Sequence, residues 1–304
     1  MLGEVFYWVF NMSIVASVMG LIVLSIRKIK GFPHRVSVFL WIVPFFRMCV
    51  PFGVNSRYSL MTLISRFTTR TITFYAPTEE LSLSYTNTLM AASSYSPLTY
   101  KFNILEKIFA VASLIWIIVA LALILALTLL YITTKRAVRD AVLLEGNVYS
   151  SEKVESPAVY GIFHPRIILP ASLPEEDRKY VLLHEKTHIR RKDNLWRLLG
   201  FLIASVHWFN PLSWVFLKVF LADLELACDE TAVGKYDTEE KKEYARTLLN
   251  CSRSKNIFVS AFGGAKVRMR IENVLSQKPM TLFSTFGFTA LVIAILYALL
   301  TNAG

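Results

Sequence analysis

Long runs of uncharged, apolar residues are the feature that most constrains how this chain can fold. Three runs contain no charged residue: Val5–Ile26, Ile108–Ile132 and Met280–Thr301. A fourth run, Val36–Val54, is interrupted by a single arginine, Arg47. An α-helix needs about 20 apolar residues to cross the ~30 Å hydrocarbon core of a bilayer. The sequence therefore predicts a polytopic membrane protein with four transmembrane helices.

The composition agrees with a membrane protein and excludes several other classes. Apolar residues make up 54% of the 304 residues and charged residues only 18%, whereas a typical soluble domain has about 25% charged residues. This composition excludes an intrinsically disordered chain, and three cysteines are too few for a disulfide scaffold. The formal net charge of +11 suits an anionic lipid surface. We therefore expect the lipid bilayer, and no nucleic acid, as a direct partner.

The basic residues predict how the helices are oriented. They crowd two places, the loop between the first two runs and the segment after the third run (Arg27, Lys28, Lys30 and Arg35; Lys135, Arg136 and Arg139). Such residues favour the cytoplasmic side of a membrane. The predicted organisation is then two transmembrane helices in 1–54 (5–26 and 36–54), an extracellular loop at 55–103, a third transmembrane helix in 104–134, a cytoplasmic domain at 135–279 and a fourth transmembrane helix in 280–304. Both chain ends are expected to be extracellular.

The cytoplasmic domain contains an H-E-x-x-H motif, His184-Glu185-Lys186-Thr187-His188. Residues four apart share one face of a helix, so His184 and His188 can present two imidazoles to one metal ion. Glu185 can act as the general base that activates water. Zn²⁺ accepts imidazole and carboxylate ligands together. Because short H-E-x-x-H strings also occur by chance, the site needs a third ligand.

Candidates for that ligand lie in a second, largely apolar helical segment. Glu225 and Asp229 are four residues apart, and a carboxylate on an apolar helix is costly unless it is paired or bound to a metal. We expect Glu225 to be the third ligand. Asp229 is expected either to hydrogen-bond a ligand imidazole or to supply a fourth oxygen. Cys228 lies on a neighbouring face and is expected to be a packing residue, and Glu230 is expected to be an exposed helix end.

The segment Leu198–Ala222 is apolar enough to be a further span, but a span there would place Glu225 across the bilayer from His184. We therefore expect a helical hairpin broken at Asn210-Pro211 that dips into the membrane interface, with Asp193 capping its first helix. Between Asn147 and Leu169, β-branched residues and turn residues predict two short strands or a hairpin. The expected fold is thus mainly α, with a small β-hairpin.

Three stretches, HEKTHIRRKDN, HWFNPLSW and ELACDE, resemble the BlaR/MecR family of membrane-embedded zinc metallopeptidases, which transduce antibiotic-induced resistance. The resemblance is close over 155–275 and extends to the order of the four spans. It implies a zincin-like peptidase domain in a bacterial cell membrane, with one zinc ion bound by His184, His188 and Glu225 and with Glu185 as the catalytic residue. It also implies a cytoplasmic winged-helix repressor as substrate, and self-cleavage after the metal-binding helices.

The resemblance leaves part of the function open. Antibiotic-sensing members continue after the fourth span into an external penicillin-binding domain, whereas this sequence ends at Gly304, so β-lactam recognition is not expected to carry over. We predict a zinc endopeptidase that transduces an external signal by cleaving itself, a repressor, or both. The segment around Phe262, Gly263 and Gly264 is the expected place of self-cleavage or gating. A housekeeping membrane metalloprotease and an inactive signalling scaffold are the alternatives, and the sequence leaves the stimulus and homo-oligomerisation open.

Overall fold

The computed structural model describes residues 2–29, 31–50, 55–56, 103–251 and 266–276, together with 287, 290, 293–295, 297 and 302–303. Three predictions therefore fall largely or wholly outside the described residues. They concern the extracellular loop at 55–103, the fourth transmembrane helix at 280–304, and the cleavage or gating segment at Phe262, Gly263 and Gly264. Of the fourth helix, the described residues between 287 and 297 are helical.

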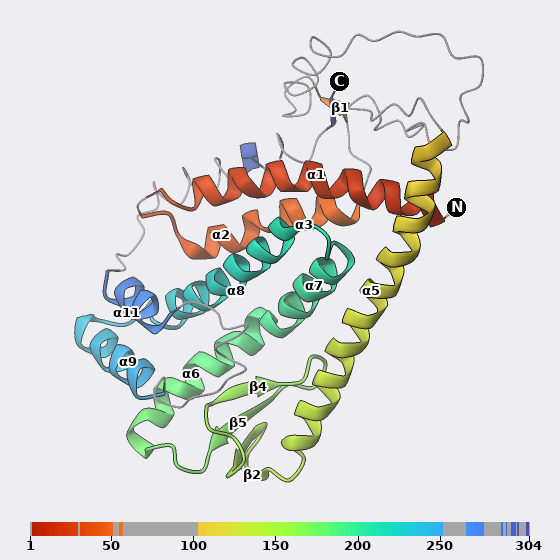
Figure 1. Ribbon diagram of the computed structural model, residues 1–304. Helices are drawn as coiled ribbons and strands as arrows, with labels where there is room; N and C mark the ends of the chain where they lie inside the picture. The colour runs from red at the N-terminus through yellow and green to blue at the C-terminus, as the bar shows by residue number, and fades with distance from the viewer. Residues whose placement is uncertain are drawn as a thin grey trace.

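The described part of the chain is mainly helical, with a small sheet at one end (Figure 1). Its helices are α1 (Leu2–Ile26), α2 (His34–Leu40), α3 (Ile42–Cys49), α5 (Asn103–Ala137), α6 (Glu175–Arg191), α7 (Asp193–Val206), α8 (Pro211–Ala232), α9 (Thr238–Cys251) and α11 (Val267–Ser276). Two residues of β1 (Asn55–Ser56) pair in parallel with β6 (Asn302–Ala303). The remaining strands form the sheet described below.

Two of the described helices are long and apolar enough to cross a bilayer. They are α1, with a mean hydropathy of 2.2, and the segment Lys107–Ala137 of α5, with a mean hydropathy of 3.0. Only 17% of the most apolar window of α5 is buried inside the protein, so most of this helix is available to lipid. These two helices agree with the first and third predicted spans. The four-span arrangement and its orientation stay predictions.

The predicted helix over 36–54 is instead two short helices, α2 and α3, which meet at Trp41. Proline has no N–H, so Pro44 cannot donate the helical hydrogen bond to the carbonyl of Leu40. Proline is tolerated in the first turn of a helix, which is the position that Pro44 occupies in α3. The prediction of one continuous helix was wrong because it gave too little weight to this proline.

The main apolar core lies where α1, α2 and α3 pack against α7 and α8 (Figure 1). Gly20 permits the close approach of α1 to α8, because a Cβ atom at this position would lie only 2.2 Å from the ring of Phe216. The predicted hairpin is present, since α7 ends at Val206 and α8 begins at Pro211. The Asn210 side chain accepts the N–H of Leu212 and donates to the hydroxyls of Ser13 and Ser17. The hairpin tip therefore lies against the middle of α1, deeper than an interfacial position if α1 crosses the bilayer.

The sheet has four strands, in the order β2 (Val142–Glu145), β3 (Val148–Ser151), β5 (Arg166–Pro170) and β4 (Ala158–Tyr160). The β3–β5 pair is parallel, and the other two pairs are antiparallel. The predicted hairpin corresponds to β4 and β5. The sheet is larger than predicted because β3 also lies in the segment that the sequence singled out and β2 lies before it. Ile167 and Leu169 of β5 are buried against Val181, and this contact fixes α6 on the sheet.

Asp223 joins α8 to the N-terminal helices. Its buried carboxylate accepts hydrogen bonds from Nε of Arg27 at 2.7 and 2.8 Å and from Nε1 of Trp41 at 2.9 Å. About two turns further along the same face of α8, Glu230 accepts the backbone N–H groups of His34 and Arg35 in the first turn of α2. Glu230 is therefore 5% exposed, and the prediction of an exposed helix end was wrong.

We expect Asp223→Asn to destabilise the fold by about 3 kcal/mol, because it leaves the Arg27 guanidinium without its counter-charge in a largely buried position. Urea unfolding of the detergent-solubilised chain, followed by circular dichroism, measures this change. Asp140→Asn is the matched control, because Asp140 forms an ion pair with Lys153 on the surface and its loss should have no measurable effect. Equal stability of the two variants would contradict the anchoring role of Asp223.

Candidate metal centre

The three side chains predicted to bind a metal come together between α6 and α8. The Nε2 atoms of His184 and His188 lie 3.0 Å apart. Glu225 places Oε2 at 3.8 Å from Nε2 of His184 and Oε1 at 3.7 Å from Nε2 of His188. Both histidines are buried, at 7% and 6% exposure. Two imidazoles and one carboxylate thus converge on one point, and this donor set fits a zinc ion.

The local chain path explains this convergence. His184 and His188 are one turn apart on α6, as their spacing predicts. The helix ends at Lys192, whose φ of 57° is left-handed, a common way to end a helix and turn the chain. The α7–α8 hairpin then runs away from α6 and returns, which brings Glu225 back to the two histidines (Figure 1).

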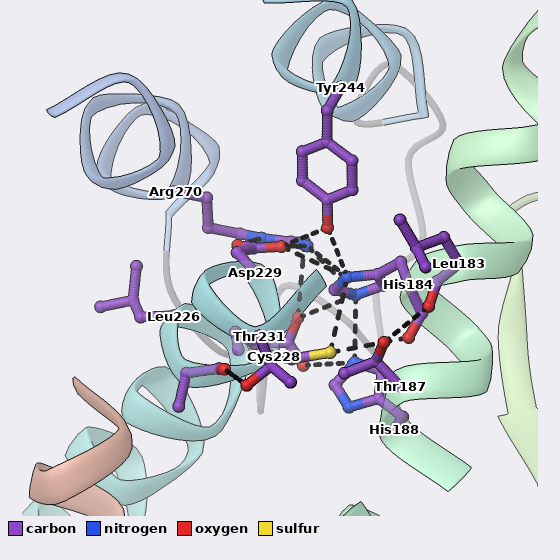
Figure 2. Close-up of polar contacts among 12 residues, drawn as sticks. Leu183, His184, Thr187, His188, Leu226, Cys228, Asp229, Thr231, Tyr244 and Arg270 are labelled. Carbon is purple, nitrogen blue, oxygen red and sulfur yellow. Dashed lines mark hydrogen bonds and ion pairs between the residues drawn. The ribbon is translucent and has the colours of Figure 1, made fainter. Parts of the chain in front are cut away.

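The other ring nitrogen of each histidine is held by a buried acid or phenol. Nδ1 of His188 lies 2.6 Å from Oδ2 of Asp193, which is 1% exposed. Nδ1 of His184 lies 2.8 Å from the hydroxyl of Tyr244 and 3.2 Å from Oδ1 of Asp229 (Figure 2). Contacts of this kind place the proton on Nδ1 and turn Nε2 toward the metal. Of the two roles predicted for Asp229, its position favours orienting His184 over supplying a fourth ligand atom.

Two arginines surround the carboxylates of the centre. The guanidinium of Arg270, on α11, donates to both oxygens of Asp229 at 2.7 and 2.8 Å and lies 3.1 Å from Nε2 of His184 (Figure 2). It also lies 3.4 Å from Oε2 of Glu225, whose other oxygen pairs with Arg197. Burial opposes ionisation of Asp229, but Arg270 outweighs it and holds the pKa of this carboxyl well below its usual range.

The sequence did not identify Asp193, Tyr244 or Arg270 as parts of this centre. Asp193 was expected to cap α7, but it makes no capping hydrogen bond and contacts His188 instead. Its position five residues after His188, beyond the end of α6, is the one signal that could have suggested this contact. Tyr244 and Arg270 lie on helices α9 and α11, and no spacing relative to the motif marks them.

Cys228 is a second candidate for the third ligand. Its sulfur, one ring nitrogen of His184 and one of His188 all lie within 4.8 Å of one another. Burial raises the pKa of this thiol, but the two neighbouring imidazoles outweigh burial and lower it overall. The sulfur lies 3.6 Å from Nδ1 of His184, however, on the side that Tyr244 and Asp229 occupy. Because the two Nε2 atoms face Glu225, the geometry favours Glu225 as the ligand.

Glu185 lies beside the ligand pair and faces the sheet. It is 7% exposed, and its charge adds to burial in raising the pKa of Tyr160 on β4. Among the described residues, no hydrogen bond or ion pair engages its carboxylate. A buried carboxylate next to the two histidines predicted to bind a metal, with no described residue engaging its oxygens, is suited to accept a proton during hydrolysis.

Comparison with known proteins identifies a matching family and several similar proteins. The model of a family described as BlaR1 peptidase M56 matches residues 7–274. Regulatory protein BlaR1 of Bacillus licheniformis is 34% identical over 102 residues, which cover 33% of this chain and 17% of the relative. Methicillin resistance mecR1 protein of Staphylococcus aureus is 26% identical over 106 residues, covering 34% and 18%. BlaR1 of Staphylococcus aureus is 23% identical over 164 residues, covering 49% and 28%. The matches thus span less than a third of the length of each relative.

Substitution of the two competing ligands distinguishes them. We expect Glu225→Gln to lose stoichiometric metal and Cys228→Ala to retain it, because only Glu225 faces both Nε2 atoms. Metal content after gel filtration measures both. The cobalt-substituted wild-type protein should also lack the intense near-ultraviolet absorption of a cobalt–thiolate bond. The presence of that absorption, and its loss in Cys228→Ala, would assign the third ligand to Cys228.

Metal binding should depend on pH. Burial lowers the pKa of His188, but the charges of Cys228 and Glu225 outweigh burial and raise it to about 9 in the absence of metal. The imidazole is then protonated at neutral pH, and a metal must displace that proton. We expect the apparent affinity to fall on the order of ten-fold for each pH unit below this pKa. Titration against a competing chelator from pH 6 to 8 measures it, and an affinity that stays constant over this range would contradict the prediction.

Proposed function

The chain belongs to the BlaR1 peptidase M56 family, and from this premise we propose that it is a membrane-embedded zinc endopeptidase that relays an external signal by proteolysis. The observation that carries the proposal is the convergence of His184, His188 and Glu225 beside the buried carboxylate of Glu185. The regulatory and resistance proteins among its relatives support a role in signalling. Because the matches cover only part of those relatives, substrate and stimulus belong to the proposal.

Each residue of the centre has a distinct role in peptide hydrolysis. The Nε2 atoms of His184 and His188, with the carboxylate of Glu225, would hold a zinc ion, which when bound supplies a Lewis acid to the peptide carbonyl and to water. Glu185 takes a proton from water as the water oxygen forms a bond to the peptide carbon. As the C–N bond breaks, Glu185 returns that proton to the leaving amine. Asp193 and Tyr244 keep the two imidazoles in orientation through Nδ1.

The proposed substrates are a cytoplasmic winged-helix repressor and the chain itself. Self-cleavage would occur around Phe262, Gly263 and Gly264. Two contacts support this site, because the helices that flank the segment both reach the centre. Tyr244 of α9 contacts His184, and Arg270 of α11 contacts Asp229 and His184. The two helices that flank the segment thus both contact the proposed peptidase centre.

We further propose a multi-pass protein of the bacterial cell membrane, with the peptidase domain in the cytoplasm. The apolar lengths of α1 and α5 support membrane insertion, and the basic residues after α5 support the orientation. An inactive scaffold would not need the carboxylate of Glu185 buried beside the proposed ligands, and no observation favours the housekeeping alternative.

Replacement of the general base tests the proposal. We expect Glu185→Gln to reduce cleavage about 10²-fold or more while metal stays bound, because Glu185 is not a ligand. The experiment is co-expression with candidate winged-helix repressors, read by immunoblot for the repressor, by mass spectrometry for the chain and by metal analysis. Glu176→Gln, an exposed acid at the start of the same helix, is the matched control and should leave cleavage unchanged.

Two outcomes would contradict the proposal. Identical shorter products from wild type and Glu185→Gln would show that another protease makes them. Intact repressor and intact chain in both strains, with the stimulus present, would favour a signalling scaffold.

A further inference from the structure

A cavity of about 1040 Å³ lies between α5, the turn that joins β4 to β5, and α7. Figure 1 shows α5 passing the sheet and α7 on this side of the protein. The cavity is separate from the metal centre, because none of the proposed ligands lines it. Its volume is that of a small-molecule site and exceeds what one side chain would fill.

One half of the cavity is apolar. On α5, Leu127, Leu130 and Tyr131 follow at helical spacing and share one face. Leu198 and Phe201 of α7 form the opposite wall. The helix face thus turns toward a second apolar surface, and the space between them suits a flexible hydrocarbon group.

The turn between β4 and β5 closes one side of the cavity and presents an unusual side chain. Phe163 lines the cavity and is 89% exposed, which is costly for an aromatic ring in water. The turn is held in place, since the Asn194 amide donates to the carbonyls of Val159 and Gly161 at 3.1 and 3.0 Å. Gly161 has a φ of 93°, a conformation that favours glycine. The backbone that carries this exposed ring is therefore held in place.

The other half of the cavity is cationic. Lys135, Arg136 and Arg139 line it from the last turn of α5 and the residues after it, and Arg166 lines it from β5. No acidic residue is among the described residues that line it. Lys135 lies on the same helix face as Leu127 and Tyr131, one turn further on. Along α5, the apolar wall therefore passes directly into the cationic wall.

We propose that this cavity binds one anionic phospholipid of the cytoplasmic leaflet. The phosphate contacts the cationic wall, and an acyl chain lies between Leu127, Leu198 and Phe201. The order of the two walls along α5 is the order of hydrocarbon and phosphate in a bilayer that this helix crosses. A soluble anion would not use the apolar wall, and an acidic peptide would have to place its side chains at the depth of lipid hydrocarbon.

A lipid in this position would connect the third span to the peptidase domain. It would contact α5 on one side, and on the other β4 and α7. The first residue of α7 is Asp193, which orients His188. The bound lipid would thereby hold the start of α7 against the span, and this role does not depend on the proposed proteolysis.

Native mass spectrometry of the full chain in detergent tests the site. The probes are phosphatidylglycerol and phosphatidylcholine with the same acyl chains, and we expect one phosphatidylglycerol per chain, preferred roughly ten-fold. The double variant Arg136→Gln/Arg139→Gln should lose this preference, and Leu198→Trp should lose the lipid by filling the apolar half. Lys28→Gln/Arg246→Gln removes two exposed basic residues elsewhere and should bind as wild type does. Thermal unfolding by circular dichroism verifies that each variant is folded.

Several results would overturn the proposal, and none of them requires a measurement of enzyme activity. Equal binding of the two lipids by wild type would show that the cavity does not select an anionic lipid. An equal loss in the control double variant would reduce the effect to general surface charge. Binding of glycerol phosphate or of an acidic peptide that survives Leu198→Trp would identify a site for a soluble partner instead of a lipid.

Discussion

The burial of three carboxylates and the partial burial of a fourth on one helix is the constraint on which the rest of the structure depends. Asp223, Glu225, Asp229 and Glu230 all lie on α8, which is otherwise largely apolar. A buried carboxylate is tolerated only when it is paired or bound. Asp223 and Glu230 meet this condition at the N-terminal helices, through Arg27, Trp41 and the first turn of α2. Glu225 and Asp229 meet it at the metal centre, through the histidines and Arg270. The helix is thus fixed from two sides, which sets the position of Glu225.

The same arrangement explains why the centre draws on so many elements. Two histidines one turn apart supply only two ligands of the proposed site, and the third ligand has to come from another helix. The imidazoles then need partners that hold their rings, and these come from α7, α8 and α9. Arg270 brings α11 to the same point. A centre built from five helices requires the whole domain to be folded before a metal finds its ligands, and metal binding in turn stabilises the fold.

Sequence reasoning reached those features that depend on local spacing or on a simple geometrical necessity. Helical periodicity predicted that His184 and His188 lie together. Because Glu225 has to reach them, the apolar segment before it was predicted to form a hairpin and not a transmembrane span. Features set by contacts distant in sequence were missed. Glu230 is buried because α2 happens to begin against it, and Tyr244 and Arg270 reach the centre from helices without a motif. The break at Trp41 and the strand β2 were local errors. The first came from underrating Pro44, and the second arose because the three consecutive apolar residues of β2 show no alternation.

The hairpin tip gives the fold a mechanical property that suits a signal transducer. Polar groups at the tip hydrogen-bond to three different helices. Asn210 donates to Ser13 of α1, the ring of His207 contacts the carbonyl of Met48 on α3, and the indole of Trp116 on α5 donates to the carbonyl of Val206. Because unpaired polar groups are costly in an apolar environment, these helices cannot shift relative to one another without moving the tip or breaking these bonds. The two arms of the hairpin lead to Asp193 and to Glu225, which contact His188. The hairpin therefore joins α1, α3 and α5 to the candidate metal centre through contacts between packed helices.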